Sequence, residues 1–285
     1  MLVRGIDLHL HSTASDGALT PTELVHRARE QGLQAIALTD HDTVDGLAEA
    51  RRAAENCGIQ LINGIELSCV WNGMTLHIVG LQIDPEAEAI RELTRLQQDN
   101  RLERAKVIAD RLGKQNFGNV WDGVRQMLGP DRVPARPDFA RYLVDKGYVD
   151  SIQQAFDSYL GAGKLGDVKQ FWPSLEAVVK AIVESGGVAV IAHPMRYKQT
   201  TAKLRRLILE FKSYGGQAIE VAVANLDSGR IGLLTELCRQ YDLYASCGSD
   251  FHMPGRPWQE IGRFPPLPAG LKPVWNLWAP QVCQG

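Results

Sequence analysis

The sequence predicts a barrel-like α/β fold that is interrupted once by a helical insertion. Seven short runs of β-branched or alternating residues recur along the chain, and most are followed by a segment of helical pattern. Repeated β-then-α units are typical of a parallel sheet, and seven of them favour a barrel. The alternation stops between residues 98 and 170, where helical pattern dominates. We therefore expect residues 1–97 and 171–285 to form the barrel and residues 98–170 to form the insertion.

Local signals place the elements in chain order. The predicted strands are residues 3–10, 35–39, 59–67, 75–83, 187–192, 218–223 and 243–248. The helices predicted around the barrel are residues 21–31, 44–56, 175–185, 203–214 and 231–240, and those of the insertion are residues 99–112, 120–127, 139–146 and 152–159. Pro21 after Thr20 is typical of a helix start, and Gly32 and Gly58 stand where helices are expected to end.

Composition excludes several classes of protein. A hydrophobic content of 45% excludes intrinsic disorder, and a net charge of −2 excludes an ordinary basic nucleic-acid module. The start of the sequence has no long apolar stretch, and no apolar run reaches membrane-spanning length, so we expect neither a signal peptide nor a membrane span. The five cysteines are widely spaced without a C-x-x-C pair, which indicates free thiols and a cytoplasmic protein.

Six of the seven histidines lie in or directly after predicted strands, namely His9, His11, His41, His77, His193 and His252. Three carboxylates share this placement: Asp16, Glu66 and Asp250. The carboxyl ends of barrel strands form one face of the fold, where active sites are built. We therefore expect these nine side chains to converge. His26 lies within a predicted helix instead and is expected to be solvated.

Residue type and spacing indicate that the nine side chains bind metal. His9 and His11 are two residues apart on a strand, as are Asp250 and His252 after the last one, so each pair leaves the same face. Cys247 has the opposite parity and is expected to point away. Imidazoles and carboxylates without thiolate suit Mn²⁺, Fe or Zn²⁺, and nine donors are enough for two or three ions. A single strand histidine would more often be a packed core residue, but six in matching places favour ligands.

Six motifs then identify a resemblance: DLHLHSTASDG (7–17), LTDHDT (38–43), GIEL (64–67), LHIVG (76–80), AHP (192–194) and GSDFH (248–252). Together and in this order they resemble the polymerase and histidinol phosphatase (PHP) family of metal-dependent hydrolases. The insertion adds RLERA (101–105), ARP (135–137) and YLGAGK (159–164), which resemble the branch of nucleoside 3′,5′-bisphosphate phosphatases and 5′–3′ exoribonucleases. The resemblance implies a distorted (β/α)7 barrel whose insertion caps the active site.

The resemblance also implies how the donors are shared among three ions. His9, His11, Glu66 and Asp250 would surround the first ion. Glu66 would bridge to a second, bound also by His77 and His193, and Asp16, His41 and His252 would hold the third. Asp7 and Asp40 would either orient ligand histidines or simply accept hydrogen bonds from the backbone.

Arginines are the expected phosphate contacts, because their planar guanidinium groups match phosphate oxygens in pairs. Arg196 lies three residues after His193, and Arg101 and Arg104 share one face of a predicted helix. The family pattern adds Ala135 and Arg136 to the substrate contacts, and we expect Arg196 and His41 to act in catalysis. Asp138 departs from the pattern, since many relatives would have histidine there.

The resulting expectation is a manganese-dependent phosphatase. It would hydrolyse nucleoside 3′,5′-bisphosphates to the nucleoside 5′-monophosphate and phosphate through a metal-activated hydroxide. The alternatives are a 5′–3′ exoribonuclease acting on short RNA ends, a histidinol-phosphate-type phosphatase, and a non-catalytic metal-binding PHP module. No obligatory protein partner is evident from the sequence.

Overall fold

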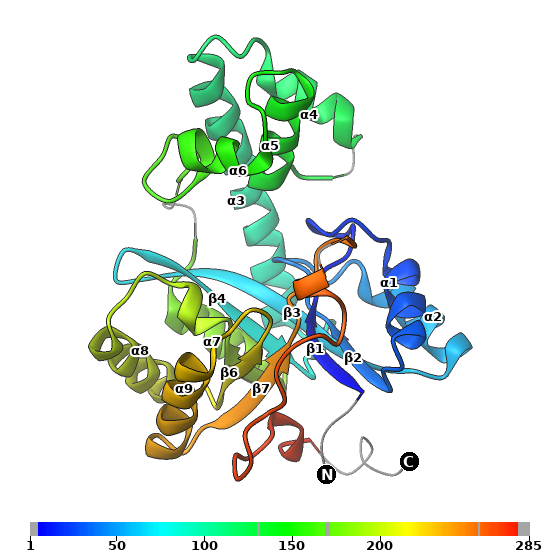
Figure 1. Cartoon of the computed structure of the whole chain (residues 1–285), viewed down its shortest axis with the longest axis vertical. Helices are drawn as coiled ribbons and strands as arrows, with labels where there is room; N and C mark the ends of the chain where they lie inside the picture. The colour runs from blue at the N-terminus through cyan, green and yellow to red at the C-terminus, as the bar shows by residue number, and fades with distance from the viewer. Residues whose placement is uncertain (1–4, 130–131, 169–171, 256, 279–285) are drawn as a thin grey trace. The chain divides into compact units, whose positions relative to one another are not determined.

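Seven strands form one sheet in the order in which they occur along the chain (Figure 1). They are β1 (Ile6–Leu10), β2 (Ala35–Leu38), β3 (Gln60–Trp71), β4 (Met74–Leu81), β5 (Val188–Ile191), β6 (Ala218–Val223) and β7 (Tyr244–Gly248). The segment after β7 lies beside β1, because the N–H of His11 donates to the carbonyl of Phe251 at 3.0 Å. The sheet is therefore a nearly closed barrel. The computed structural model describes residues 5–129, 132–168, 172–255 and 257–278.

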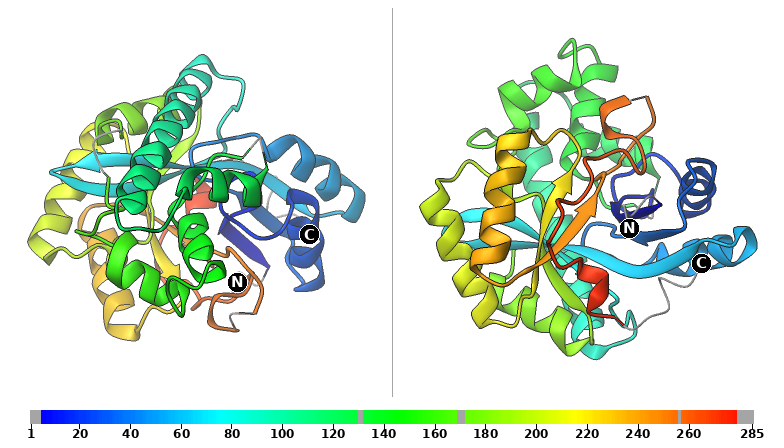
Figure 2. Two further views of the ribbon diagram at one scale, coloured as in Figure 1. Left: turned by 90° about the horizontal axis from the view of Figure 1, so that it is seen from above. Right: turned by 60° about the horizontal axis from the view of Figure 1, so that its bottom comes forward.

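The helices around the barrel cover the outer face of the sheet. They are α1 (Pro21–Glu30), α2 (Leu47–Cys57), α7 (Leu175–Glu184), α8 (Thr201–Ser213) and α9 (Ser228–Gln240), with short 3-10 turns η2 (Pro194–Arg196), η3 (Pro257–Gln259) and η4 (Val274–Asn276). Figure 2 shows α1 and α2 on one side and α8 and α9 on the other. The expected start of α1 is confirmed: Thr20 accepts from the N–H of Glu23, and Glu23 accepts from that of Thr20.

The expectation of parallel pairing is wrong at β4, which runs antiparallel to both of its neighbours, β3 and β5. The hairpin from β3 to β4 turns through Asn72 and Gly73, whose φ angles are 47° and 75°. Positive φ at both central residues is what a type I′ turn requires, and Asn-Gly is a favoured pair for it. A parallel crossover needs a dozen or more residues. The two-residue connection therefore dictates the reversed direction.

The barrel interior is filled by one apolar cluster to which all seven strands contribute and, among the described residues, no α-helix does. It includes Leu8, Ala37, Val79, Val190 and Cys247. Two further clusters join the outer face of the sheet to the helices, for example Leu38 of β2 against Leu24 of α1. The interior is thus packed along the strands, and polar side chains gather at the carboxyl ends of the parallel strands.

Residues 95–172 form a second compact unit, and residues 1–94 with 173–285 form the first. Helix α3 (Glu88–Gly113) begins in the first unit and ends in the second, so it starts well before the expected position. The other helices of the second unit are α4 (Val120–Leu128), α5 (Arg136–Asp145), α6 (Ile152–Ala155) and the π-helix η1 (Phe156–Leu160). They have an apolar core of their own, which includes Ile108, Phe139 and Leu143.

Two further expectations concern the described residues. None of the helices in the described ranges is long and apolar enough to cross a membrane. Cys57, Cys69, Cys238 and Cys247 are free thiols, as expected, and Cys283 lies outside the described residues.

Candidate metal centre

The nine predicted donors come together at one end of the barrel. Six of the strands place them. β1 carries His9, with His11 directly after it, and His41 follows β2. Glu66 lies within β3, His77 lies in β4, His193 follows β5, and Asp250 and His252 follow β7. Asp16 lies in the loop after β1. Because β4 is antiparallel, its first half lies level with the carboxyl ends of the parallel strands. His77 therefore reaches the same end as the others.

Glu66 lies at the centre of this cluster, and its two carboxylate oxygens face different imidazoles. Oε2 lies 3.1 Å from His9 Nε2, 3.2 Å from His11 Nε2 and 3.1 Å from His41 Nδ1. Oε1 lies 3.1 Å from His77 Nδ1 and 2.9 Å from His193 Nε2. The Glu66 side chain is fully buried. A carboxylate in this position can serve two cations at once, one through each oxygen.

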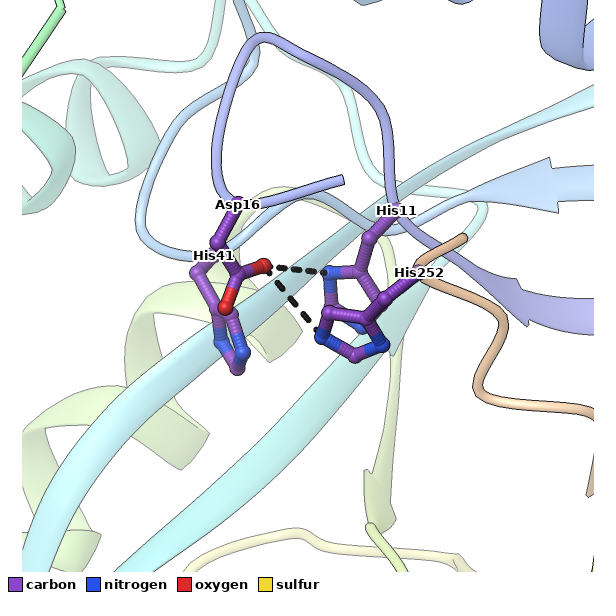
Figure 3. Close-up of side chains that lie close together, drawn as sticks. All are labelled: His11, Asp16, His41 and His252. Atoms are coloured by element: carbon purple, nitrogen blue, oxygen red, sulfur yellow. Dashed lines mark ion pairs between the residues drawn. The ribbon is translucent and has the colours of Figure 1, made fainter. Parts of the chain in front are cut away.

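Three groups of side chains could each hold a divalent ion, since their donor atoms lie within 4.8 Å of one another. They are His9, His11, Glu66 and Asp250; His11, Asp16, His41 and His252; and His41, Glu66 and His77. Figure 3 shows the second group, in which the Asp16 carboxylate lies 3.2 Å from His252 Nε2 and 3.9 Å from His11 Nδ1. The grouping differs from the expected one in three ways. His11 also belongs to the Asp16 group, and His41 belongs both to that group and to the group of Glu66 and His77. His193 is in none of the three groups, although its Nε2 lies 2.9 Å from Glu66 Oε1.

The cluster changes the pKa values of its members strongly. Burial acts to raise the pKa of Glu66, but the imidazoles of His41, His9 and His77 outweigh it and hold that pKa well below its usual range. Burial acts to lower the pKa of His11, but the adjacent carboxylates of Asp250 and Glu66 raise it to about 10. Burial dominates at His41 and lowers its pKa well below the ordinary value. The neighbouring imidazoles therefore favour the ionised form of the Glu66 carboxylate, and burial favours the neutral form of His41.

The donor atoms fit a cation. Five buried atoms that face the cluster have no hydrogen-bond partner among the described residues: His11 Nδ1, Asp16 Oδ1, His41 Nδ1, Glu66 Oε2 and His77 Nδ1. Buried polar atoms without a hydrogen bond are rare, because leaving them unsatisfied costs free energy. Lone pairs of nitrogen and carboxylate oxygen that point at one another are satisfied by a divalent ion. Nitrogen and oxygen donors without thiolate suit Mn²⁺, Fe or Zn²⁺.

Asp7 and Asp40 hold the loops around the cluster rather than the imidazoles. Asp40 accepts from the N–H and the hydroxyl of Ser12 and from the hydroxyl of Ser15, at 2.6–2.7 Å. Asp7 accepts from the backbone N–H groups of Ser249 and Gly262, and burial raises its pKa to about 6. Of the two roles expected for Asp7 and Asp40, these hydrogen bonds favour the backbone role.

Glu220 is a buried carboxylate at the site that the sequence reasoning missed. It lies within β6 and is 1% exposed. Its Oε1 accepts from His9 Nδ1 at 2.6 Å, and its Oε2 accepts from the backbone N–H of His193 at 2.5 Å. The available signal was a lone carboxylate in the apolar strand AIEVAV, since such a group is seldom buried without a partner.

Gly248 ends β7 against His9, and no side chain fits there. A Cβ atom on Gly248 would lie 2.4 Å from His9 Cβ and 2.9 Å from the His9 backbone nitrogen. We expect Gly248→Ala to lower the free energy of unfolding by about 1–3 kcal/mol, as overpacking does. The measurement is chemical denaturation followed by circular dichroism.

The matched control is Gly232→Ala in helix α9, where an added Cβ meets no atom within 4 Å. Because alanine is the better helix former, this change is expected to stabilise the protein by about 0.5–1 kcal/mol. A Gly248→Ala variant as stable as the wild type would show that His9 has room to move.

The predicted phosphate contacts fall into both units. Arg196 ends η2, its side chain is 40% exposed, and its Nη1 donates to Asp250 Oδ2, so the structure places it beside the cluster. In the second unit Arg104 is buried, and its Nε donates to the carbonyl of Val168 at 2.7 Å. The guanidinium groups of Arg101 and Arg104 each lie 5.4 Å from the ring centre of Trp172.

The turn at the start of α5 carries the remaining expected contacts. Arg136 Nη1 donates to the carbonyl of Leu160 at 3.3 Å, and the N–H of Ala135 donates to Asp138 at 2.8 Å. Asp138 is fully buried and also pairs with Arg132 and Arg141. Its carboxylate therefore stabilises the first turn of the helix. His26, expected to be solvated, is exposed on α1.

Comparison with known proteins agrees with this architecture. Residues 7–104 match the PHP domain family. A 5′-3′ exoribonuclease of Haemophilus influenzae is 42% identical over 275 residues, 96% of this chain and 99% of the relative. A 3′,5′-nucleoside bisphosphate phosphatase of Chromobacterium violaceum is 43% identical over 271 residues, 95% of each chain.

Among solved structures, an amidohydrolase from Chromobacterium violaceum with bound sulfate and no metal has a TM-score of 0.90 and 42% identity. The match covers 96% of this chain and 95% of that one. Similarity therefore extends over both units and over nearly the whole length. With its nearly closed seven-stranded barrel and its cluster of imidazoles and carboxylates, the chain belongs to the PHP family of metal-dependent phosphoesterases.

Proposed function

We propose that the protein is a phosphatase that hydrolyses nucleoside 3′,5′-bisphosphates to nucleoside 5′-monophosphates and inorganic phosphate, with two or three divalent ions. The position of Glu66 carries the proposal, because each of its oxygens faces a separate set of imidazoles. The bisphosphate phosphatase of Chromobacterium violaceum, 43% identical, supports this substrate. We propose manganese as the metal, with iron and zinc as the alternatives that the same nitrogen and carboxylate donors also suit.

The ligands of these ions would be the nine clustered donors, from His9 to His252. Bound divalent ions would activate water and neutralise charge on the phosphate that reacts. The chain's own residues then bind and orient the substrate. His41 Nδ1 lies 3.1 Å from Glu66 Oε2 and would act in catalysis there, and Arg196 binds the reacting phosphate while its Nη1 holds Asp250 in place.

We assign the second phosphate to the insertion, residues 98–170, which would act as a cap when substrate is bound. Arg104 and Arg136 are the main contacts, with Arg101 and the backbone at Ala135 beside them. Arginine suits this role because its fork of N–H groups binds two phosphate oxygens. Binding energy from this remote phosphate would be used to position the reacting one.

A second candidate function is 5′–3′ exoribonuclease activity on short RNA. It is favoured by the Haemophilus influenzae relative of that name, 42% identical over 96% of this chain. The two activities share the demand for a metal centre and a remote phosphate. They differ in whether a nucleoside or a longer strand occupies the site. A cytoplasmic location and the absence of an obligatory protein partner remain predictions.

A phosphate-release screen tests the proposal. Protein freed of metal by a chelator and reloaded with Mn²⁺ is offered adenosine 3′,5′-bisphosphate, a short RNA with a 5′-phosphate, and histidinol phosphate. We expect the bisphosphate to have the highest kcat/KM and the chelated protein to be inactive. Faster turnover of RNA would transfer the assignment to the exoribonuclease. Absence of any turnover in the metal-loaded protein would favour a non-catalytic metal-binding module.

A further inference from the structure

Glu220 joins two parts of the barrel that are not neighbours in the sheet. It lies in β6, whereas His9 lies in β1, and β7 stands between these two strands. The contact between Glu220 Oε1 and His9 Nδ1, at 2.6 Å, therefore crosses the barrel interior. Both side chains are buried, so water does not compete for this hydrogen bond.

The first consequence concerns the tautomer of His9. Carboxylate oxygens accept hydrogen bonds, so the contact of 2.6 Å assigns the donated proton to His9 Nδ1. Nε2 is then the ring nitrogen left to bind a cation. That atom lies 3.1 Å from Glu66 Oε2 and 3.5 Å from Asp250 Oδ1, inside the cluster. Glu220 therefore fixes both the direction of the ring and the nitrogen that faces the cluster.

The second consequence concerns the backbone of His193. This residue has a φ angle of 30°, which side-chain-bearing residues rarely adopt and which costs free energy. Its N–H donates to Glu220 Oε2 at 2.5 Å, and its Nε2 lies 2.9 Å from Glu66 Oε1. The hydrogen bond to Glu220 stabilises the conformation that turns this imidazole towards Glu66.

We propose that Glu220 is a positioning residue that couples two ion sites, by orienting His9 on one side of Glu66 and His193 on the other. The inference rests on the proposed metal chemistry of the cluster. Histidines that bind metal commonly donate their second ring N–H to a carboxylate, and loss of that partner costs about 10–100-fold in metal affinity. Here one carboxylate accepts hydrogen bonds from both His9 and His193, so its loss affects the ion sites on both sides of Glu66.

Glu220→Gln separates this role from simple space filling. The amide has nearly the same shape but only one acceptor oxygen, so it can accept from His9 or from the His193 N–H but not from both. Its NH₂ group must face the remaining donor. The matched control is Glu236→Gln, which makes the same change at an exposed position of α9.

The test measures metal binding rather than turnover. The metal-free wild type, Glu220→Gln and Glu236→Gln proteins are titrated with Mn²⁺ by calorimetry, and bound ions per chain are counted by elemental analysis. Co²⁺ absorption spectra then report the ligand geometry. We expect Glu220→Gln to bind about 10–100-fold more weakly, with fewer ions at limiting metal and an altered Co²⁺ spectrum. Glu236→Gln should match the wild type.

The outcomes separate the inference from the proposed function. Glu220→Gln with wild-type affinity, ion count and spectrum would overturn the positioning role and leave the phosphatase proposal standing. A wild-type protein that binds no ions would overturn both. If Glu220→Gln does not fold, Glu220→Asp carries the test, because it keeps the charge on a shorter side chain. Weaker binding by Glu220→Asp supports the inference, and unchanged binding contradicts it.

Discussion

Replacing Glu66 with Gln is expected to reduce kcat/KM for phosphate release by about a thousandfold or more. That factor corresponds to about 4 kcal/mol of transition-state stabilisation. The reason is geometric: both Glu66 oxygens are engaged, one with three imidazoles and the other with two. An amide offers one oxygen and one NH₂ group, and the NH₂ group cannot bind a cation. The bridge between the two sides of the cluster is therefore lost.

The measurement is phosphate release from the Mn²⁺-loaded variant beside wild type and Glu236→Gln, with circular dichroism to show that each protein is folded. Activity of Glu66→Gln within tenfold of the wild type would contradict a bridging role. Wild-type activity that survives exhaustive chelation would contradict metal dependence altogether. The two results distinguish an error about one residue from an error about the whole centre.

The convergence of the nine donors could be predicted because it follows from topology. Residues at the carboxyl ends of parallel strands meet at one end of a barrel, whatever the details of packing. His9 and His11 show the rule at its simplest, since alternate residues of β1 share a face. Whether these side chains bind ions stays a prediction, but the structure brings them together with donor atoms a few ångströms apart.

The direction of β4 was misjudged although its signal was in the sequence. The β-then-α rhythm favoured a parallel strand, whereas Asn72-Gly73 between two apolar runs is a hairpin signal. The local turn prevails, because no crossover fits between Trp71 and Met74. The error left His77 in the right place for the wrong reason: in a parallel strand its position would have been at the opposite end of the barrel.

Glu220 could not have been paired with His9 from the sequence. The two residues are 211 positions apart, and their contact depends on closure of the barrel across β7. Local pattern shows only that a carboxylate interrupts an apolar strand. Asp7 and Asp40 show the converse, because their place beside the ligand motifs left open both a role in orienting imidazoles and a backbone role. Their hydrogen bonds go to backbone and serine groups.

Arg136→Ala is expected to lower kcat/KM for the nucleoside bisphosphate by a factor of about 10 to 100. This follows from a cost of about 1.5–3 kcal/mol for a lost charge-assisted hydrogen bond. A simple monoester such as p-nitrophenyl phosphate has no second phosphate, so its kcat/KM should change far less. Arg136→Lys should recover part of the loss, since lysine keeps the charge but not the fork. Arg205→Ala, at an exposed position of α8, controls for loss of positive charge.

The role of Arg136 follows from how the loss of kcat/KM for the bisphosphate compares with the loss for the monoester. Its Nη1 also donates to the carbonyl of Leu160, so truncation removes a contact within the insertion as well as the proposed contact with phosphate. If Arg136 had a purely structural role, its loss would lower kcat/KM equally for both substrates, because the truncation would disturb the fold of the insertion whichever substrate is offered. A selective loss requires direct contact with the phosphate that only one substrate carries. If Arg136→Ala lowers kcat/KM for a short RNA as strongly as for the bisphosphate, and the wild type turns over that RNA faster than the bisphosphate, the same arginine is assigned to binding the 5′ end of RNA.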